Sequence, residues 1–210
     1  MSPTEIEQYL KRFAGMDDVL ERVDRETSAR PNAMMQSRSD QGALLTLLTR
    51  MLDAREALEV GTFTGYGAVC IARGLAPGGK LTCLEVDAEI AEVARRNLEA
   101  AGLSDRAEVK VGPAAEALEA IPAIPHIDFV YVDADKDGYP GYYEQIVPRL
   151  RPGGLVVLDN TLLGGRVLDA ENERGRMMTA LNERVADDVR VESVLLGLND
   201  GMTLARKRVS

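Results

Sequence analysis

The feature that most constrains the fold is an alternation of short strand-like and longer helix-like segments that begins at Ala57. The last two of the five strand-like segments are almost entirely apolar, as expected of strands buried on both faces. Such alternation predicts right-handed crossovers and an α/β fold with a doubly wound, mostly parallel sheet. The predicted strands are 57–60, 80–86, 107–111, 127–132 and 154–158, and the predicted helices are 65–75, 88–101, a short one ending near 120, 140–150 and 171–185.

The two ends of the chain depart from this alternation. Segments 191–196 and 202–206 predict two closing strands, joined by the hairpin-type turn Asn199-Asp200-Gly201. Residues 4–27 predict one or two peripheral helices, and another helix should run from Ser39 to about Leu52. No linker is visible, so we expect residues 1–210 to form one domain with an N-terminal helical cap at about 1–52.

Charge and composition exclude several classes of protein. The 210 residues include 25 basic and 34 acidic side chains, giving a net charge of −9, which disfavours a nucleic-acid partner. No apolar run is long enough for a membrane span, and the start MSPTEIEQYL does not resemble a signal peptide. We therefore expect a cytoplasmic protein without a membrane partner, in which Cys70 and Cys83 are buried free thiols.

In parallel α/β sheets, ligands bind beyond the carboxyl ends of the strands, so the residues there are the candidates for function. Glu59 and Gly61 end the first strand, but the spacing is not G-x-G-x-x-G, and an acidic residue before the glycine suits a cationic ligand. Taken alone, Gly61 and Gly65 are equally compatible with a simple tight turn between strand and helix. Glu85, at the end of the second strand, is placed to accept both hydroxyls of a ribose, unless it is a solvated acid or Asp87 takes that role.

Two further strand ends carry oxygen ligands. Asp133 follows the fourth strand, and Asp159 and Asn160 follow the fifth. Each acid alone is more often a helix N-cap, but together they predict a site for Mg²⁺, Mn²⁺ or Ca²⁺ if the two strands are neighbours. Lys136 lies close by, and because a cation disfavours its charged form it is a candidate general base; the alternative is a surface lysine paired with an acid.

These residues resemble a known family, the cation-dependent S-adenosylmethionine O-methyltransferases of the catechol and caffeoyl-CoA type, including their small bacterial relatives. The resemblance covers about Met34 to Lys207. The motifs that carry it are Met34-Met35, Ser39-Asp-Gln-Gly42, Leu58-Glu-Val-Gly-Thr-Phe-Thr-Gly-Tyr66, Val132-Asp-Ala-Asp-Lys136, Pro152-Gly-Gly154, Asp159-Asn-Thr161 and Asn199-Asp-Gly201. It implies a Rossmann-like, seven-stranded methyltransferase fold with an antiparallel C-terminal hairpin and a homodimeric assembly.

The resemblance also implies roles for individual residues. Ser37, Glu59, Gly61 and Thr62 would line the methionine part of the cofactor, Glu85 would hold the ribose and Ala114 would lie by the adenine. Asp133 would touch both metal and cofactor, with Asp135 close by, while Asp159 and Asn160 complete the metal ligands and Lys136 is the base. Gly67 lies in the cofactor loop, where relatives often carry a serine, and the segment after Asn160 lacks a tryptophan common in plant relatives.

The expected activity is cation-dependent transfer of a methyl group from S-adenosylmethionine to a hydroxyl of a small catechol-type aromatic substrate. Both oxygens would chelate the cation, which favours the phenolate, and the phenolate would attack the sulfonium methyl. Three alternatives remain: a metal-independent small-molecule methyltransferase, a nicotinamide-dependent oxidoreductase on a similar fold, and a non-catalytic cofactor-binding protein.

Overall fold

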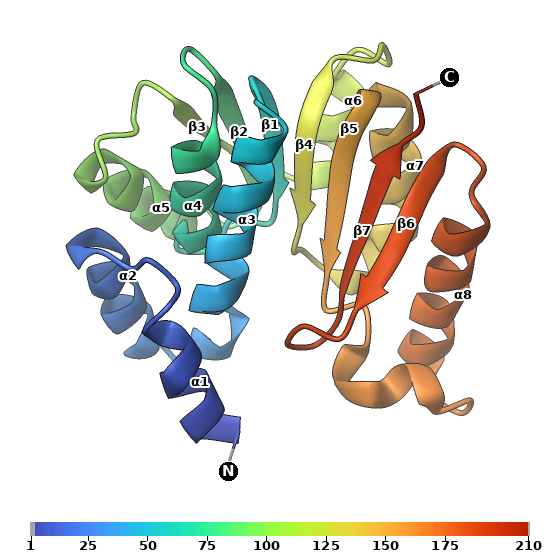
Figure 1. Cartoon of the computed structure of the whole chain (residues 1–210), viewed down its shortest axis with the longest axis horizontal. Coiled ribbons are helices and arrows are strands. Elements are labelled where there is room, and N and C mark those ends of the chain that lie inside the picture. The colour runs from blue at the N-terminus through green and yellow to red at the C-terminus, as the bar shows by residue number, and fades with distance from the viewer. Residues whose placement is uncertain (1–2, 210) are drawn as a thin grey trace.

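The computed structural model describes residues 3–209 and contains one seven-stranded sheet with the strand order β3-β2-β1-β4-β5-β7-β6 (Figure 1). Strands β1 to β5 pair in parallel, and β7 is antiparallel to both of its neighbours. The predicted fold class and the antiparallel C-terminal hairpin are therefore confirmed. The strands are β1 Glu56–Val60, β2 Lys80–Glu85, β3 Ala107–Val111, β4 Ile127–Val132, β5 Leu150–Asp159, β6 Val191–Leu196 and β7 Met202–Lys207.

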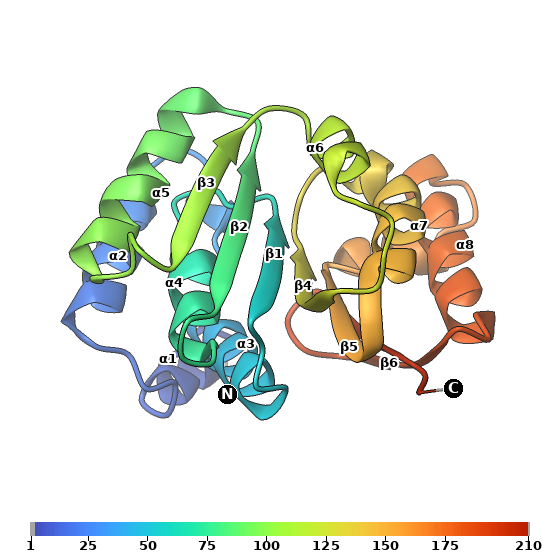
Figure 2. The same cartoon turned by 90° about the horizontal axis from the view of Figure 1, so that it is seen from above.

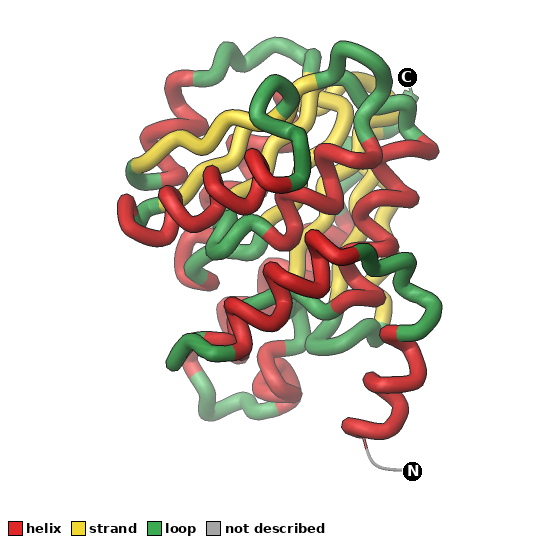
Figure 3. Tube along the Cα trace, turned by 90° about the vertical axis from the view of Figure 1, so that its left-hand side faces the viewer, coloured by secondary structure: helices red, strands yellow, loops and turns green. Residues whose placement is uncertain are grey.

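Helices cover the sheet from both sides (Figures 2 and 3). One apolar cluster joins the sheet to α2, α3, α4 and α5, and a second joins its other face to α6, α7 and α8. None of the described helices is both long and apolar enough to cross a membrane. The helices are α1 Pro3–Lys11, α2 Asp18–Ser28, α3 Ser39–Met51, α4 Tyr66–Gly74, α5 Ala88–Ala100, α6 Ala114–Ala120, α7 Tyr139–Arg149 and α8 Glu173–Asp187, with the short 3₁₀ helices η1 Ala33–Met35, η2 Lys136–Gly138 and η3 Leu163–Leu168.

Two elements, β5 and α8, begin more than one residue away from their predicted starts at 154 and 171. Strand β5 begins at Leu150 rather than Gly154, because the backbone already pairs with Ile127 before the Pro152-Gly153 turn signal, across a register irregularity. Helix α8 begins at Glu173, since the side chain of Asn172 accepts a hydrogen bond from the backbone N–H of Gly175 and caps the helix there.

The strand order places the functional edge of the sheet. It reverses between β1 and β4, which is the topological switch point where α/β sheets bind ligands. Strands β4 and β5 are parallel neighbours, with Val132 opposite Leu158. The residues that follow, Asp133 and Asp159, therefore leave the sheet side by side, which confirms the condition on which the predicted metal site depended.

Candidate active site

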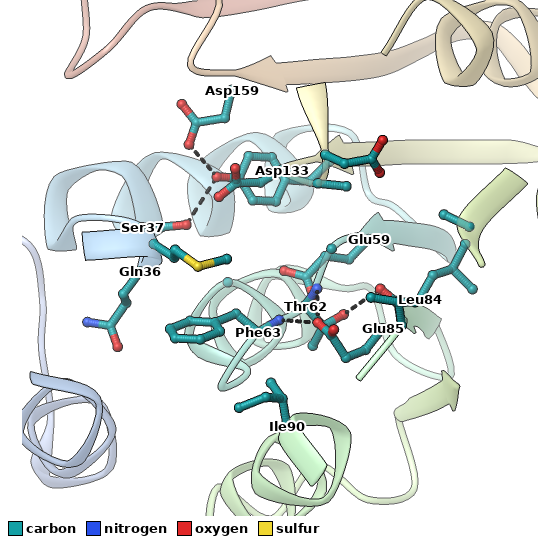
Figure 4. Close-up of a pocket in the computed structure, with 18 of the residues that line it drawn as sticks. Gln36, Ser37, Glu59, Thr62, Phe63, Leu84, Glu85, Ile90, Asp133 and Asp159 are labelled. Atoms are coloured by element: carbon teal, nitrogen blue, oxygen red, sulfur yellow. Dashed lines mark hydrogen bonds between the residues drawn. The ribbon is translucent and has the colours of Figure 1, made fainter. Parts of the chain in front are cut away.

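A cavity of about 790 Å³ opens at the carboxyl ends of β1, β2, β4 and β5 (Figure 4). In Figure 4, Glu59, Thr62 and Glu85 lie on one side of the view, and Asp133, Asp159 and Ser37 lie on the other. All the candidate residues from the sequence line this cavity: Ser37, Glu59, Gly61, Thr62, Gly67, Glu85, Ala114, Asp133, Asp135, Lys136, Asp159 and Asn160.

The loop after β1 is shaped by glycine. Gly61 has a φ of 85°, and a Cβ at this position would collide with the backbone of Asp133. Gly65 has a φ of 88° and precedes the first residue of α4. Only glycine adopts these conformations without strain, so the loop can pass directly beneath the end of β4.

Glu85 ties this loop to the end of β2. Its carboxylate accepts hydrogen bonds from the backbone N–H groups of Phe63 at 2.8 Å, Thr62 at 3.3 Å and Asp87 at 3.0 Å. A carboxylate has about four acceptor positions, so this one retains capacity for a ligand hydroxyl. Asp87 also lines the cavity, but its carboxylate caps α5 by accepting hydrogen bonds from the backbone N–H groups of Glu89 and Ile90.

Glu59 is the most unusual charge of this half of the site. The side chain is 1% exposed, and its Oε2 has no hydrogen-bond partner among the described residues. Burial raises the pKa of Glu59 to about 8. A Cβ at Gly67 would collide with Oε1 of Glu59, so glycine at this position makes room for the carboxylate. A buried acid with one unpartnered oxygen beside a cavity calls for a ligand that brings a cation or a hydrogen-bond donor.

Asp133 and Lys136 form an ion pair at the end of β4. The Nζ of Lys136 donates to Oδ1 of Asp133 at 3.0 Å and to the hydroxyl of Tyr139 at 2.6 Å. The ammonium also lies 4.6 Å from the centre of the Tyr139 ring. The alternative of a lysine paired with Asp135 or Asp137 does not apply, because Asp135 accepts from Tyr142 and from the backbone of Gly138, and Asp137 pairs with Arg174.

Asp159 is held from three directions. Gln41 Nε2 donates to both carboxylate oxygens at 2.9 and 2.8 Å, the Tyr131 hydroxyl donates to Oδ2 at 2.7 Å, and the Asn160 N–H donates to Oδ1 at 2.7 Å. The side chain is 1% exposed. Burial, reinforced by the negative charge of Asp133, raises the pKa of Asp159 to about 6. Lys136 brings one positive charge to this pair of acids, and the side-chain donors to Asp159 are neutral, so the pair keeps a net negative charge when both acids are ionised.

The oxygen ligands fit a hard cation. Within residues 3–209, no three side chains of His, Cys, Asp or Glu gather as a metal-binding group. Any cation must therefore be held by the carboxylates of Asp133 and Asp159, the amide of Asn160 and oxygens from outside the protein. Asn160 has a φ of 56°, a left-handed conformation that asparagine tolerates, at the point where the chain turns away from β5. Two acids and an amide suit Mg²⁺ or Mn²⁺, which keep several non-protein ligands.

Sequence reasoning missed three side chains of this site. Tyr131 lies in an almost entirely apolar strand, which predicts a core residue; its ring is buried, but its hydroxyl contacts both Asp159 and Ser37. Gln41 belongs to the predicted helix start and to the Ser39-Asp-Gln-Gly42 motif, neither of which assigns a role to its side chain, and Tyr139 belongs to no motif. The register of β1 and β4 offered one signal, because Tyr131 lies opposite Glu59 and so points to the same face of the sheet. No local pattern indicated Gln41.

The fold and the cavity define a doubly wound α/β protein with a pocket at its switch point, lined by acidic side chains from the ends of β1, β2, β4 and β5. A family model described as O-methyltransferase matches residues 12–208. Among curated proteins, caffeoyl-CoA O-methyltransferase 2 of Petunia hybrida is 32% identical over 86% of this chain and 80% of its own length. Tricin synthase 1 of rice is 35% identical over 83% of this chain and 75% of its own length.

Solved structures of O-methyltransferases are also similar to this chain. An O-methyltransferase from Bacillus cereus in complex with SAH superposes with a TM-score of 0.89 and 32% identity, and each chain covers 97% of the other. TomG of Streptomyces achromogenes, an O-methyltransferase of tomaymycin synthesis in complex with SAM, has a TM-score of 0.88 and 31% identity over 100% of both chains. The chain belongs to the O-methyltransferase family, so the expectation of an S-adenosylmethionine-dependent O-methyltransferase is confirmed.

Proposed function

We propose that the protein transfers a methyl group from S-adenosylmethionine to a hydroxyl of a catechol-type small molecule and that the transfer requires a divalent cation. The observation that carries this proposal is the pairing of Asp133 with Asp159 in the same cavity as Glu59 and Glu85. The side chains of one half of the cavity suit a cofactor with nucleoside and amino-acid parts. Those of the other half suit a hard cation. Family membership favours methyl transfer over nicotinamide chemistry.

The cofactor would occupy the half formed by β1 and β2. Glu85 retains an acceptor position for ribose hydroxyls, and the unpartnered Oε2 of Glu59 suits the positive charge of the methionine moiety. Gly61 and Thr62 would allow the cofactor to approach the backbone closely. Ala114, the first residue of α6, lines the same cavity and would lie by the adenine, while Ser37 and Asp135 close its other side.

The cation would be held by Asp133, Asp159 and Asn160. When bound, a divalent cation acidifies a hydroxyl that coordinates it, which is the reason for proposing a vicinal diol as acceptor. Lys136, whose Nζ contacts Asp133 and Tyr139 at the edge of the cavity, would take the hydroxyl proton in its neutral form, which a bound cation favours by disfavouring the charged form. The protein would otherwise contribute mainly by positioning the two reactants.

The decisive experiment is methyl transfer from labelled S-adenosylmethionine to 3,4-dihydroxybenzoate, 3,4-dihydroxybenzyl alcohol and 3,4-dihydroxybenzylamine. Each reaction is run with Mg²⁺ or Mn²⁺ and again with excess chelator, and the matched monophenols serve as controls. We expect label only on the diols and only with the cation. Undiminished transfer in chelator would instead support the metal-independent alternative.

We also propose that the protein forms a homodimer. The face of β6 and β7 opposite α8 has no helix over it in Figure 1, and on it Val194 and Leu196 are 48% and 36% exposed. Leu204, opposite Val194 in the register, continues this apolar surface toward α3, where Leu47 is 53% exposed. A second copy would cover this half of the sheet. Light scattering after size exclusion should show a dimer, and Leu196→Lys should convert it to a monomer.

A further inference from the structure

We propose that Gln41 is a positioning residue that orients Asp159 toward the cation without neutralising its charge. The inference rests on the proposed function, because it concerns the proposed cation site. Gln41 belongs to the Ser39-Asp-Gln-Gly42 motif, to which the proposed reaction assigns no role. It lies 118 positions from Asp159 in the sequence and at hydrogen-bonding distance in the fold.

The amide of Gln41 has one orientation. Its Oε1 accepts hydrogen bonds from the backbone N–H of Arg38 at 2.9 Å and from Asn199 Nδ2 at 3.2 Å. With two donors on the oxygen, the nitrogen must face Asp159, where it contacts both carboxylate oxygens. Three segments distant in the sequence thus meet on one side chain: the start of α3, the end of β5 and the β6–β7 turn. Gln41 has 0% exposure, so water does not compete for these contacts.

The backbone of Gln41 is fixed by its neighbour. A Cβ at Gly42 would lie 2.8 Å from the Sγ of Cys70 and 2.8 Å from the ring of Tyr66, both on α4. The missing side chain at Gly42 therefore lets α3 pack tightly against α4. This packing fixes the position of α3, and with it the position of Gln41 relative to the end of β5. The motif residues Gln41 and Gly42 therefore act together in placing the Gln41 amide.

The chemistry of the donor explains why an amide suits this position. An arginine or lysine would hold the carboxylate as firmly, but its charge would cancel the negative charge that attracts a cation. A neutral amide donates hydrogen bonds and leaves that charge in place. Tyr131, the other side chain that donates to Asp159, is a phenol and also brings no positive charge. Both donors restrict the carboxylate without neutralising it.

The experiment measures Mn²⁺ affinity directly, by the loss of the free Mn²⁺ paramagnetic resonance signal on titration, with the full chain and with neither cofactor nor acceptor present. Gln41→Met keeps the length of the side chain and removes the donor. Because outer contacts of metal ligands typically contribute a factor of about 10–100 to metal affinity, we expect the affinity to fall by that factor. Gln41→Lys keeps a donor but adds a positive charge, and we expect it to weaken Mn²⁺ binding at least as much.

Two control variants distinguish a general loss of stability, an error in the proposed cation site and an error in the proposed role of Gln41. Thr49→Val removes a buried hydroxyl of the same helix, which donates to the Leu45 carbonyl at 2.7 Å, and should lower the melting temperature without changing Mn²⁺ affinity. Asp159→Ala should abolish Mn²⁺ binding. If it does not, the proposed cation site is wrong. If Asp159→Ala abolishes binding but either Gln41 variant binds Mn²⁺ like the wild type, the site stands and the positioning role of Gln41 is overturned.

Discussion

The two halves of the cavity hold their acids in different ways. Glu85 is held by backbone N–H groups of the adjacent loops, at Thr62, Phe63 and Asp87. Asp159 is held largely by side chains, those of Gln41 and Tyr131, which come from other parts of the chain. The first half is therefore built by the local shape of a glycine-containing turn. The second half depends on how α3 and β4 pack against β5.

This difference has a functional meaning. Backbone donors cannot be exchanged by substitution, so the cofactor half tolerates change in its surroundings as long as the turn is kept. Side-chain donors can be exchanged one at a time, so the cation half is the part in which single substitutions should produce graded changes. Single substitutions in each half therefore distinguish the two modes of support.

The largest effect is expected at the cation half. Asp159→Ala should lower kcat/KM by about 10³-fold, since a metal contributes several kcal/mol to stabilising developing charge. Cofactor affinity should change by less than about 3-fold by calorimetry, because the backbone turn that shapes the other half stays intact. A parallel loss of cofactor affinity would show that the two halves are not separable.

The converse test is made at the cofactor half. Glu85→Ala removes an acceptor of charge-assisted hydrogen bonds, and calorimetry should show cofactor affinity about 10–100-fold weaker. Mn²⁺ affinity should be unaltered. Glu85→Gln is the matched control, which keeps one carbonyl acceptor and should lose less. Wild-type affinity in Glu85→Ala would reject the ribose assignment.

Glu59 sharpens the comparison because its burial opposes folding. Its pKa is raised from 4.5 to about 8, so the folded state binds a proton that the unfolded state releases, and stability falls as pH rises through this range. Glu59→Gln should therefore raise the free energy of unfolding at pH 8 by roughly 1–3 kcal/mol, with little gain at pH 4. Denaturant titrations at both pH values measure this, and a destabilised variant at pH 8 would contradict it.

The smallest effect is expected at Asp188, a carboxylate far from the cavity. Its contribution to stability changes with pH in the opposite direction to that of Glu59. Hydrogen bonds from Arg190 lower the pKa of Asp188 from 3.8 to about 2. The stability this provides is present above pH 4 and is lost as pH falls toward 2. Asp188→Asn should lower the free energy of unfolding by about 1 kcal/mol at pH 7, after allowance for solvent screening around the arginine. The difference from wild type should vanish near pH 2, and activity should be unaffected.

Much of the fold could be predicted because its pattern is local. The alternation of segments, the glycines at 61 and 65 and the Asn199-Asp-Gly201 turn each act within a few residues, and the structure has the strands and turns they predict. The sequence predicts the convergence of Asp133 and Asp159 only if their strands are neighbours, and the sheet supplies that condition, because parallel neighbours bring their carboxyl ends to one edge. What the pattern could not supply was the set of partners around each acid.

The sequence by itself determined that acids stand at the ends of the strands and that glycine turns leave room beside them. Only the tertiary structure decided which of those acids are unpartnered, which are held by neutral donors and which are paired with a lysine. The reason is physical: Gln41 reaches Asp159 across 118 positions, and Asn199 reaches Gln41 across 158. Contacts of that span are set by the packing of α3 on α4, which depends on the whole core rather than on any local run of residues.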